Sequence, residues 1–327
     1  MISKRVIPPN QLGLGLNLST KKTRKREFLD EMDRVVPWSA LVQIVEPHSP
    51  RAKTGRPPFA IETMLRIHYL QQWFGLSDPA MEEALHDVPL YREFAGLADG
   101  VSRLPDETTI LRFRHLLEAH DLAVDMLRVV NDILQAKGLL LRTGTAVDAT
   151  LIAAPSSTKN AEGERDPEMH QAKKGNQWYF GMKAHIGVDA TSGLVHTVVG
   201  TSANVSDINV AGALLHGEEH AAFGDSGYQG VHKRAEAAGP TWHVAMRPGK
   251  RRLLNPFIEP EFVAERVEKM KASIRAKVEH PFRVIKQQFG FTKVRYRGLA
   301  KNTAQIVTLF ALSNLWMARR KLMEVRG

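Results

Sequence analysis

Three acidic residues stand at positions where a carboxylate is costly or isolated. Asp148 interrupts the apolar stretch "AVDAT", Asp225 ends the apolar stretch "AAFGD", and Glu279 lies alone among cations in "IRAKVEHPFRVIKQQFG". A lone acid in a buried strand is unfavourable unless it is paired or binds a metal. Mg²⁺ prefers such oxygen ligands, and two ions a few Å apart support in-line phosphoryl displacement. The residue types therefore favour metal-assisted phosphoryl transfer.

Glu279 lies in a basic stripe. In a regular helix, Arg275, Glu279, Arg283 and Lys286 fall at i, i+4, i+8 and i+11, which is one helical face. We expect the carboxylate to bind metal and the cations to bind phosphates; the alternative is a set of surface ion pairs. Pro281 lies inside this segment and predicts a kink or a break, because proline removes one helical hydrogen bond.

The charge of the chain favours a polyanionic partner. The net charge is +10 and the isoelectric point is about 9.8. Nucleic acid is the obvious polyanion, since neutralising phosphates releases counterions. The alternative is a solvated basic surface. The chain has no cysteine, which excludes disulfides and thiolate zinc sites. Further candidate phosphate contacts are Lys173, Lys174, Arg247, Lys250, Arg251 and Arg252.

Helical patterns occupy the first part of the chain. Residues 1–26 hold seven Lys or Arg and no acid, which predicts a flexible basic arm. Residues 27–139 have helical periodicity, with Ser77 and Asp106 as N-cap candidates. Arg112 and Arg114 are expected to point outward towards DNA. This region is predicted to be either a helix-turn-helix-like DNA reader or a helical dimerisation domain.

Residues 140–327 change to an α/β pattern. Strands are expected at 143–154, in a hairpin over 179–201, at 221–225 and at 241–249, with a helix over 205–220. This order predicts an α/β fold with a mixed five-stranded sheet flanked by helices. Trp178 begins a strand and is expected in the core, with base stacking as the alternative.

Two different functions remain as alternatives. "HGEEH" at 216–220 matches the His-x-x-Glu-His pattern of some zinc peptidases, with His216, Glu219 and His220 as ligands and catalyst on a helix. The other alternative is a DNA-binding protein without catalytic activity. Zinc-dependent activity would favour the first, and binding without cleavage the second.

Several long stretches resemble one family. They include "ETMLRIHYLQQW", "VDATLIAAPSSTKN", "RDPEMHQAKKGNQWYFGMKAHIGVDATSGLVH", "GDSGYQG" and "KASIRAKVEHPFRVIKQQFGF". These stretches resemble the DDE transposases with a ribonuclease-H-like catalytic core, and more narrowly the insertion-sequence-five family. The resemblance implies an Mg²⁺-dependent enzyme, with Mn²⁺ as a possible substitute and two ions per site. It also implies cleavage of transposon ends and joining of the 3′-hydroxyl to target DNA.

The resemblance also implies roles for individual residues. Asp148, Asp225 and Glu279 correspond to the first, second and third catalytic, metal-binding acids. Arg275, Glu279 and Lys286 match the spacing of a Tyr-x2-Arg-x3-Glu-x6-Lys signature, in which Ala272 replaces the tyrosine. The implied partners are double-stranded DNA, as terminal inverted repeats and as target, and further copies of the chain as a homodimer or higher multimer. The implied location is the bacterial cytoplasm, at the nucleoid, without a membrane.

Overall fold

The computed structural model describes residues 21–50, 57–97, 103–161, 163–255 and 257–324. The chain forms two compact units, Met1–His120 with Lys321–Gly327 and Asp121–Arg320. Most of the predicted basic arm lies outside the described residues. Its last part is helical, because α1 begins at Arg24, and the Thr23 hydroxyl caps it by accepting a hydrogen bond from the Arg26 N–H at 3.2 Å.

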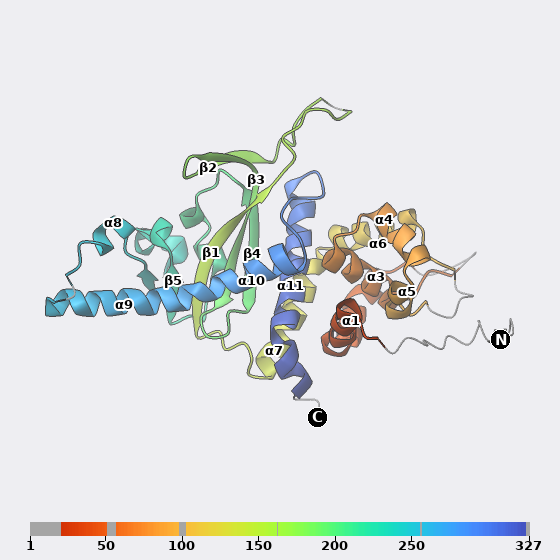
Figure 1. Ribbon diagram of the computed structural model, residues 1–327, viewed down its shortest axis with the longest axis horizontal. Coiled ribbons are helices and arrows are strands. Elements are labelled where there is room, and N and C mark those ends of the chain that lie inside the picture. Colours follow the sequence, from red (N-terminus) through yellow and green to blue (C-terminus); the bar gives the residue numbers. More distant parts are fainter. Residues whose placement is uncertain (1–20, 51–56, 98–102, 162, 256, 325–327) are drawn as a thin grey trace, which may run out of the picture. The chain divides into compact units, whose positions relative to one another are not determined.

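The first unit is helical, as its periodicity predicts (Figure 1). Two predicted N-caps are confirmed: Ser77 accepts from the Ala80 N–H and Asp106 from the Thr109 N–H, at 3.3 and 2.8 Å. Such caps satisfy N–H groups that lack a partner within the helix. The helices are α1 (Arg24–Val35), α2 (Trp38–Val45), α3 (Ile61–Phe74), α4 (Asp78–Asp87), α5 (Pro89–Phe94) and α6 (Glu107–Ala119), with a 3-10 turn at Glu46–His48.

The second unit is built on a mixed six-stranded sheet. Its strand order is β2-β3-β1-β5-β6, and β4 also pairs with β3. The strands are β1 (Gly144–Ala153), β2 (His170–Lys174), β3 (Gln177–Asp189), β4 (Val195–Ser202), β5 (Ala221–Gly224) and β6 (Thr241–Val244). β2 and β4 pair with successive halves of one edge of β3, while β1 pairs antiparallel along the other edge. β5 and β6 continue the sheet in parallel.

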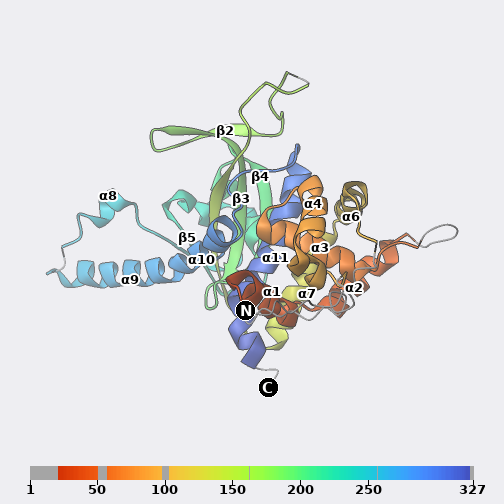
Figure 2. The ribbon, with the colours of Figure 1, turned by 45° about the vertical axis from the view of Figure 1, so that its right-hand side comes forward.

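Different layers cover the two faces of this sheet. Val198 of β4 packs against buried residues of α7 (Leu122–Ala136) and α11 (Leu299–Glu324), which run side by side in Figures 1 and 2. Its neighbour Val199 packs against a second cluster that includes Val147 and Tyr228. Successive side chains of a strand point to opposite faces, so the fold buries both. The α/β prediction is therefore confirmed.

The segment after β6 is helical and leads back to the sheet. A short helix, α8 (Pro248–Arg251), precedes α9 (Glu259–Arg275), which runs beyond the edge of the sheet in Figures 1 and 2. A 3-10 turn at Ala276–Val278, α10 (Glu279–Arg283) and a π-helical turn at Val284–Gln288 follow directly.

Two expectations about the second unit are wrong. Residues 205–220 form 3-10 turns at Asp207–Asn209 and Gly212–Leu214 instead of a helix. Gly212 passes so close to the Glu236 carbonyl that a Cβ there would lie 2.0 Å from it, which favours a tight turn. The sixth strand, β2, lies between the strand expected at 143–154 and the hairpin expected at 179–201, where no strand was predicted. The side chains of His170–Lys174 do not alternate between apolar and polar, so no strand pattern was visible in the sequence.

Asparagine side chains fix the position of α11. Asn314 is fully buried; its amide donates to the Val195 carbonyl and to Asn131, and its oxygen accepts from the Val195 N–H. Asn302 closes the loop before α11 by binding the backbone of Arg295, Tyr296 and Gly298. Among the described residues, no helix has the length and apolar character that a membrane span requires.

Candidate active site

The pairing of β1 with β5 determines where Asp148 and Asp225 lie. The last paired positions are Ala146 and Phe223, in parallel register. Each aspartate lies two residues further along its strand direction, so the continued register brings them side by side. Directly opposed residues of neighbouring strands share a face of the sheet. The two acids that sequence analysis selected therefore lie together at one place.

Local hydrogen bonds hold both aspartates. Asp225 caps the 3-10 turn Ser226–Tyr228, and its Oδ1 accepts from the Gly227 N–H at 2.8 Å. Asp148 Oδ1 accepts from the Ala149 N–H at 2.7 Å. Among the described residues, no hydrogen bond engages the other oxygen of either carboxylate. Asp148 also points away from the face that Val147 buries, because the two residues are neighbours in β1.

Glu279 lies where the helical segment changes its winding. The backbone passes from α9 through the 3-10 turn Ala276–Val278 into α10, and then into a π turn. Pro281 lacks the N–H that would bind one turn earlier, and the irregular winding surrounds it. The predicted break in regular helix is confirmed. Val278 is buried, whereas Glu279 and Arg283 are exposed.

The charge distribution ties Glu279 to the two aspartates. Burial raises the pKa of Asp148 to about 6, and the Ala149 N–H opposes this rise. The carboxylates of Asp225 and Glu279 raise the pKa further, while the guanidinium of Arg275 lowers it. Charges act on a pKa in this way only over short distances. The three acids and Arg275 therefore form one electrostatic site.

Two cavities adjoin this site. One, of about 250 Å³, is lined by Asp225, Ser226, Arg275 and Glu268 among others. The other, of about 460 Å³, is lined by Thr150, Glu279, Arg283 and Lys286 among others. The predicted cations Arg275, Arg283 and Lys286 thus line cavities that also contain the predicted acids.

Lys286 binds β1 directly. Its ammonium donates to the Thr150 hydroxyl at 2.6 Å and to the Leu151 carbonyl at 3.1 Å. Burial lowers the pKa of Lys286, the charge of Lys174 lowers it further, and Glu279 acts in the opposite direction. Lys174 belongs to the β2–β3 hairpin, so this hairpin brings a second cation towards the site.

The other predicted phosphate contacts of this unit differ in their surroundings. Lys173 and Lys174 are exposed on β2. Arg247, Lys250 and Arg252 are exposed around α8. Arg251 instead forms a two-point ion pair with Glu265 at 2.9 Å for each contact. Its guanidinium is therefore already occupied by an acid of α9.

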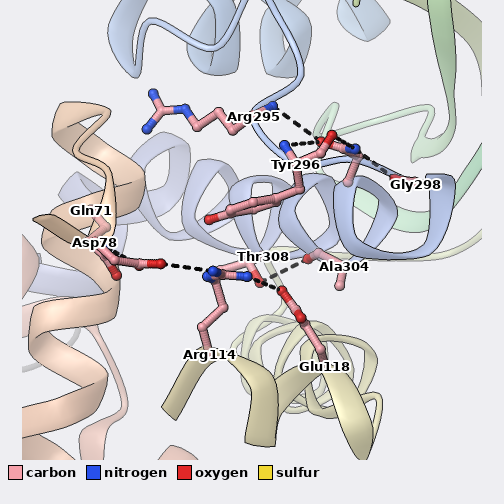
Figure 3. A network of polar contacts seen from close by, with 10 residues as sticks. Gln71, Asp78, Arg114, Glu118, Arg295, Tyr296, Gly298, Ala304 and Thr308 are labelled. Atoms are coloured by element: carbon pink, nitrogen blue, oxygen red, sulfur yellow. Dashed lines mark hydrogen bonds and ion pairs between the residues drawn. The ribbon is translucent and has the colours of Figure 1, made fainter. Parts of the chain in front are cut away.

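The predicted outward orientation of Arg114, in the first unit, is wrong. Arg114 is 7% exposed and binds Asp78 and Glu118, each at 2.8 Å, while Gln71 donates to the same Asp78 (Figure 3). The expected outward direction failed because Arg114 shares the inner face of α6 with Ile110 and Leu117. Arg112 is exposed, and it lines a cavity of about 670 Å³ within this unit.

The zinc-peptidase reading of "HGEEH" lacks its predicted geometry. Residues 216–220 are not helical, and His220 is exposed. Glu219 instead joins His216 and His196 of β4, with one potential ligand atom of each within 4.8 Å. The Glu219 carboxylate accepts hydrogen bonds from the Thr145 hydroxyl and from the N–H groups of His216 and Gly217. Sequence analysis missed His196, which is distant in sequence and belongs to no motif with the others.

The expected core position of Trp178 is also wrong. Its side chain is 62% exposed, at the start of β3. The strand begins outside the body of the sheet, where β3 pairs with β2 through Lys173 and Trp178. Asp207, which begins the 3-10 turn Asp207–Asn209, binds Lys183 at 2.8 Å.

The donor set of the candidate site suits divalent cations. The carboxylates of Asp225 and Glu279 add to the cost of ionising Asp148. Hard cations such as Mg²⁺ take carboxylate oxygens and relieve this repulsion. The residues present therefore fit a metal site, and Asp148, Asp225 and Glu279 are the side chains that would hold it.

Comparison with known families gives two matches. The family model for the transposase DDE domain matches residues 140–315. The model described as transposase domain (DUF772) matches residues 16–116. The first match covers more than half of the chain and contains all three acids. No solved structure matches the chain.

Proposed function

Because this chain belongs to the family of transposases with a DDE domain, we propose that Asp148, Asp225 and Glu279 are its catalytic acids and cut DNA at the ends of a mobile element. The observation that carries the proposal is the parallel register of β1 and β5, which sets Asp148 beside Asp225 although they lie far apart in sequence. The charge of Glu279, which lies in the irregular helix around Pro281, also acts on Asp148 and supports its inclusion in the same set. The narrower likeness to the insertion-sequence-five family supports the same assignment.

The proposed reaction has two phosphoryl transfers. A water oxygen attacks the phosphorus at the element end, the bond from phosphorus to O3′ breaks, and a free 3′-hydroxyl results. That hydroxyl then attacks a phosphodiester of target DNA and releases a target 3′-hydroxyl. No protein nucleophile is required. Transposases of this family typically use divalent metal ions, which supply charge neutralisation at phosphate and activation of the attacking oxygen.

The cations around the acids have a positioning role in this proposal. Arg275 and Arg283 line the two cavities beside the acids and would bind phosphate oxygens of the transposon end. Lys286 is held by Thr150 and Leu151, so its charge has a fixed position relative to Asp148 on the same strand. Fixed charges stabilise the charge that develops in the transition state without reorganisation. Binding of paired ends by two or more copies belongs to the same proposal.

The first unit is proposed to bind DNA or to mediate dimerisation. Arg112 is its remaining candidate from the sequence, since Arg114 is buried in ion pairs. The proposed organisation keeps a basic arm at 1–26, a helical region at 27–139 and a catalytic region at 140–327.

The test compares the intact protein with Glu279→Gln on a labelled duplex that carries the element's own end, with Mg²⁺. Glu259→Gln, an exposed acid of α9, is the matched control. We expect the intact protein and the control to nick at the element boundary, and Glu279→Gln to bind the end without nicking it. Equal cleavage by all three proteins would remove Glu279 from the catalytic set. Binding by all three without cleavage would identify a DNA-binding protein without catalytic activity.

A further inference from the structure

The β2–β3 hairpin has an aromatic and basic face that the catalytic proposal does not use. Lys173 pairs directly with Trp178, and Gln171 with Phe180, so these four side chains share one face of the hairpin. The guanidinium of Arg165 lies over the Phe180 ring at 5.5 Å from its centroid. We call Lys173, Trp178, Phe180 and Arg165 the aromatic-basic face.

Trp178 is the unusual member of this face. Its side chain is 62% exposed, although tryptophan is largely buried on average in folded proteins. The hairpin itself is well defined: Gly175 and Asn176 form the two-residue turn, and Gly175 has a φ of 61°, which such turns require. The exposed indole is thus presented on a paired strand rather than on an irregular loop.

The hairpin adjoins the candidate active site. Its strand β3 continues into the pairing with β1, where Ala153 opposes Gly181. Leu151 of the same stretch of β1 accepts a hydrogen bond from Lys286. The charge of Lys174, on the opposite face of the hairpin from Lys173, reaches Lys286. A strand of DNA bound at the acids would therefore pass close to the hairpin.

From this placement we propose that Trp178 stacks on an unpaired nucleobase of the DNA, while Lys173 and Arg165 bind the adjoining phosphates. This inference rests on the proposed function for its choice of DNA as the ligand. Aromatic faces bind bases of any sequence, and cations beside them bind the backbone. A base within an intact duplex has both faces covered by its neighbours, so the hairpin would select DNA whose strands are opened near the site of cleavage.

The test measures the affinity of the full chain for a short oligothymidylate and for a duplex of equal length. Trp178→Ala is expected to weaken oligothymidylate binding by about 5- to 100-fold, as for the loss of one stacked base. Trp178→Phe keeps an aromatic ring and is expected to retain most of the affinity. Binding of the duplex should change little in either variant. Leu141→Ala is the matched control, since Leu141 is another exposed apolar side chain, at 48%.

Fluorescence separates stacking from other effects. The chain has five tryptophans. Oligothymidylate should quench part of the fluorescence emission of the intact protein. The same part of the emission should be missing in Trp178→Phe. Unchanged oligothymidylate affinity in Trp178→Ala would overturn the inference. An equal loss of affinity for both DNA forms would overturn it too, because stacking on unpaired bases predicts a selective loss.

The two proposals fail separately. Trp178→Ala tests the binding of oligothymidylate, and Glu279→Gln tests the cleavage of the element end. If Trp178 matters for this binding but Glu279 does not matter for cleavage, the catalytic assignment fails alone. If Glu279 is required for cleavage and Trp178→Ala binds both DNA forms normally, the stacking role fails alone.

Discussion

Lys286 donates a hydrogen bond of 2.6 Å to Thr150, which lies two residues after Asp148 in β1. A π turn carries the lysine, and the strand that carries the proposed first acid carries its acceptor. The position of one cation is therefore fixed relative to the acids by the sheet itself.

Replacing Lys286 by methionine should reduce the salt dependence of end binding. A phosphate contact contributes about one unit to the slope of log affinity against log salt, so Lys286→Met should lower that slope by about one. The measurement is a binding titration at several salt concentrations. Lys233→Met, at an exposed lysine of the same unit, is the control. An unchanged slope would show that Lys286 only supports the strand.

The pKa of Asp148 predicts opposite effects of pH on stability and on metal binding. Its folded-state value of about 6 exceeds the ordinary 3.8, so the folded chain holds this proton more tightly than the unfolded chain. Without metal ions, the free energy of unfolding should fall as the pH rises from about 4 through 6. Above this range Asp148→Asn should be more stable than the intact protein, by at most about 3 kcal/mol. Thermal unfolding at pH 5 and at pH 7.5 measures this effect.

The same group should control the response to Mg²⁺. The ionised carboxylate is the metal ligand, so stabilisation by Mg²⁺ should appear in the intact protein only as the pH rises through about 6. Asp148→Asn should lose most of this stabilisation. Equal thermal shifts with Mg²⁺ in both proteins would contradict the assignment of Asp148 as a ligand.

Arg114→Ala should lower the free energy of unfolding of the first unit, and this loss of stability should exceed any effect on DNA contacts. The change leaves Asp78 and Glu118 without their buried partner, a loss that typically costs about 3–5 kcal/mol. Arg112→Ala, at the exposed arginine of the same helix, should change stability by less than about 0.5 kcal/mol. Urea unfolding of both variants tests the contrast. Equal stabilities would show that the ion pairs of Arg114 contribute nothing net.

Gly200→Ala should destabilise the second unit. A Cβ at Gly200 of β4 would lie 2.1 Å from the Thr303 hydroxyl of α11, which is closer than real contacts allow. Overpacking of this kind costs about 1–3 kcal/mol. Gly249→Ala is the control, because nothing lies within 4 Å of its Cβ position. A Gly200→Ala protein as stable as the control would mean that α11 shifts away from the sheet at little cost.

The sequence predicted those features that depend on local chemistry. Ser77 and Asp106 cap helices as expected, and the acids at 148 and 225 are conspicuous because they interrupt apolar strands. Arg114 and Trp178 were misplaced for the opposite reason. Whether a side chain faces the core depends on which elements pack around it. The periodicity of a helix or a strand does not show which part of that element is in contact with the core. The cluster of His196, His216 and Glu219 likewise exists only through the pairing of distant segments.

The order of the three acids along the chain has a consequence for protein synthesis. Asp148 lies within β1 and Asp225 directly follows β5, whereas Glu279 comes only after α9. Domains begin to fold while the chain is still being made. A nascent chain therefore contains β1, β5 and both aspartates before its third acid has been made. On the proposed assignment, a chain that stops before Glu279 cannot cut DNA, and cutting begins only after the segment that carries Glu279 and Lys286 has folded onto β1.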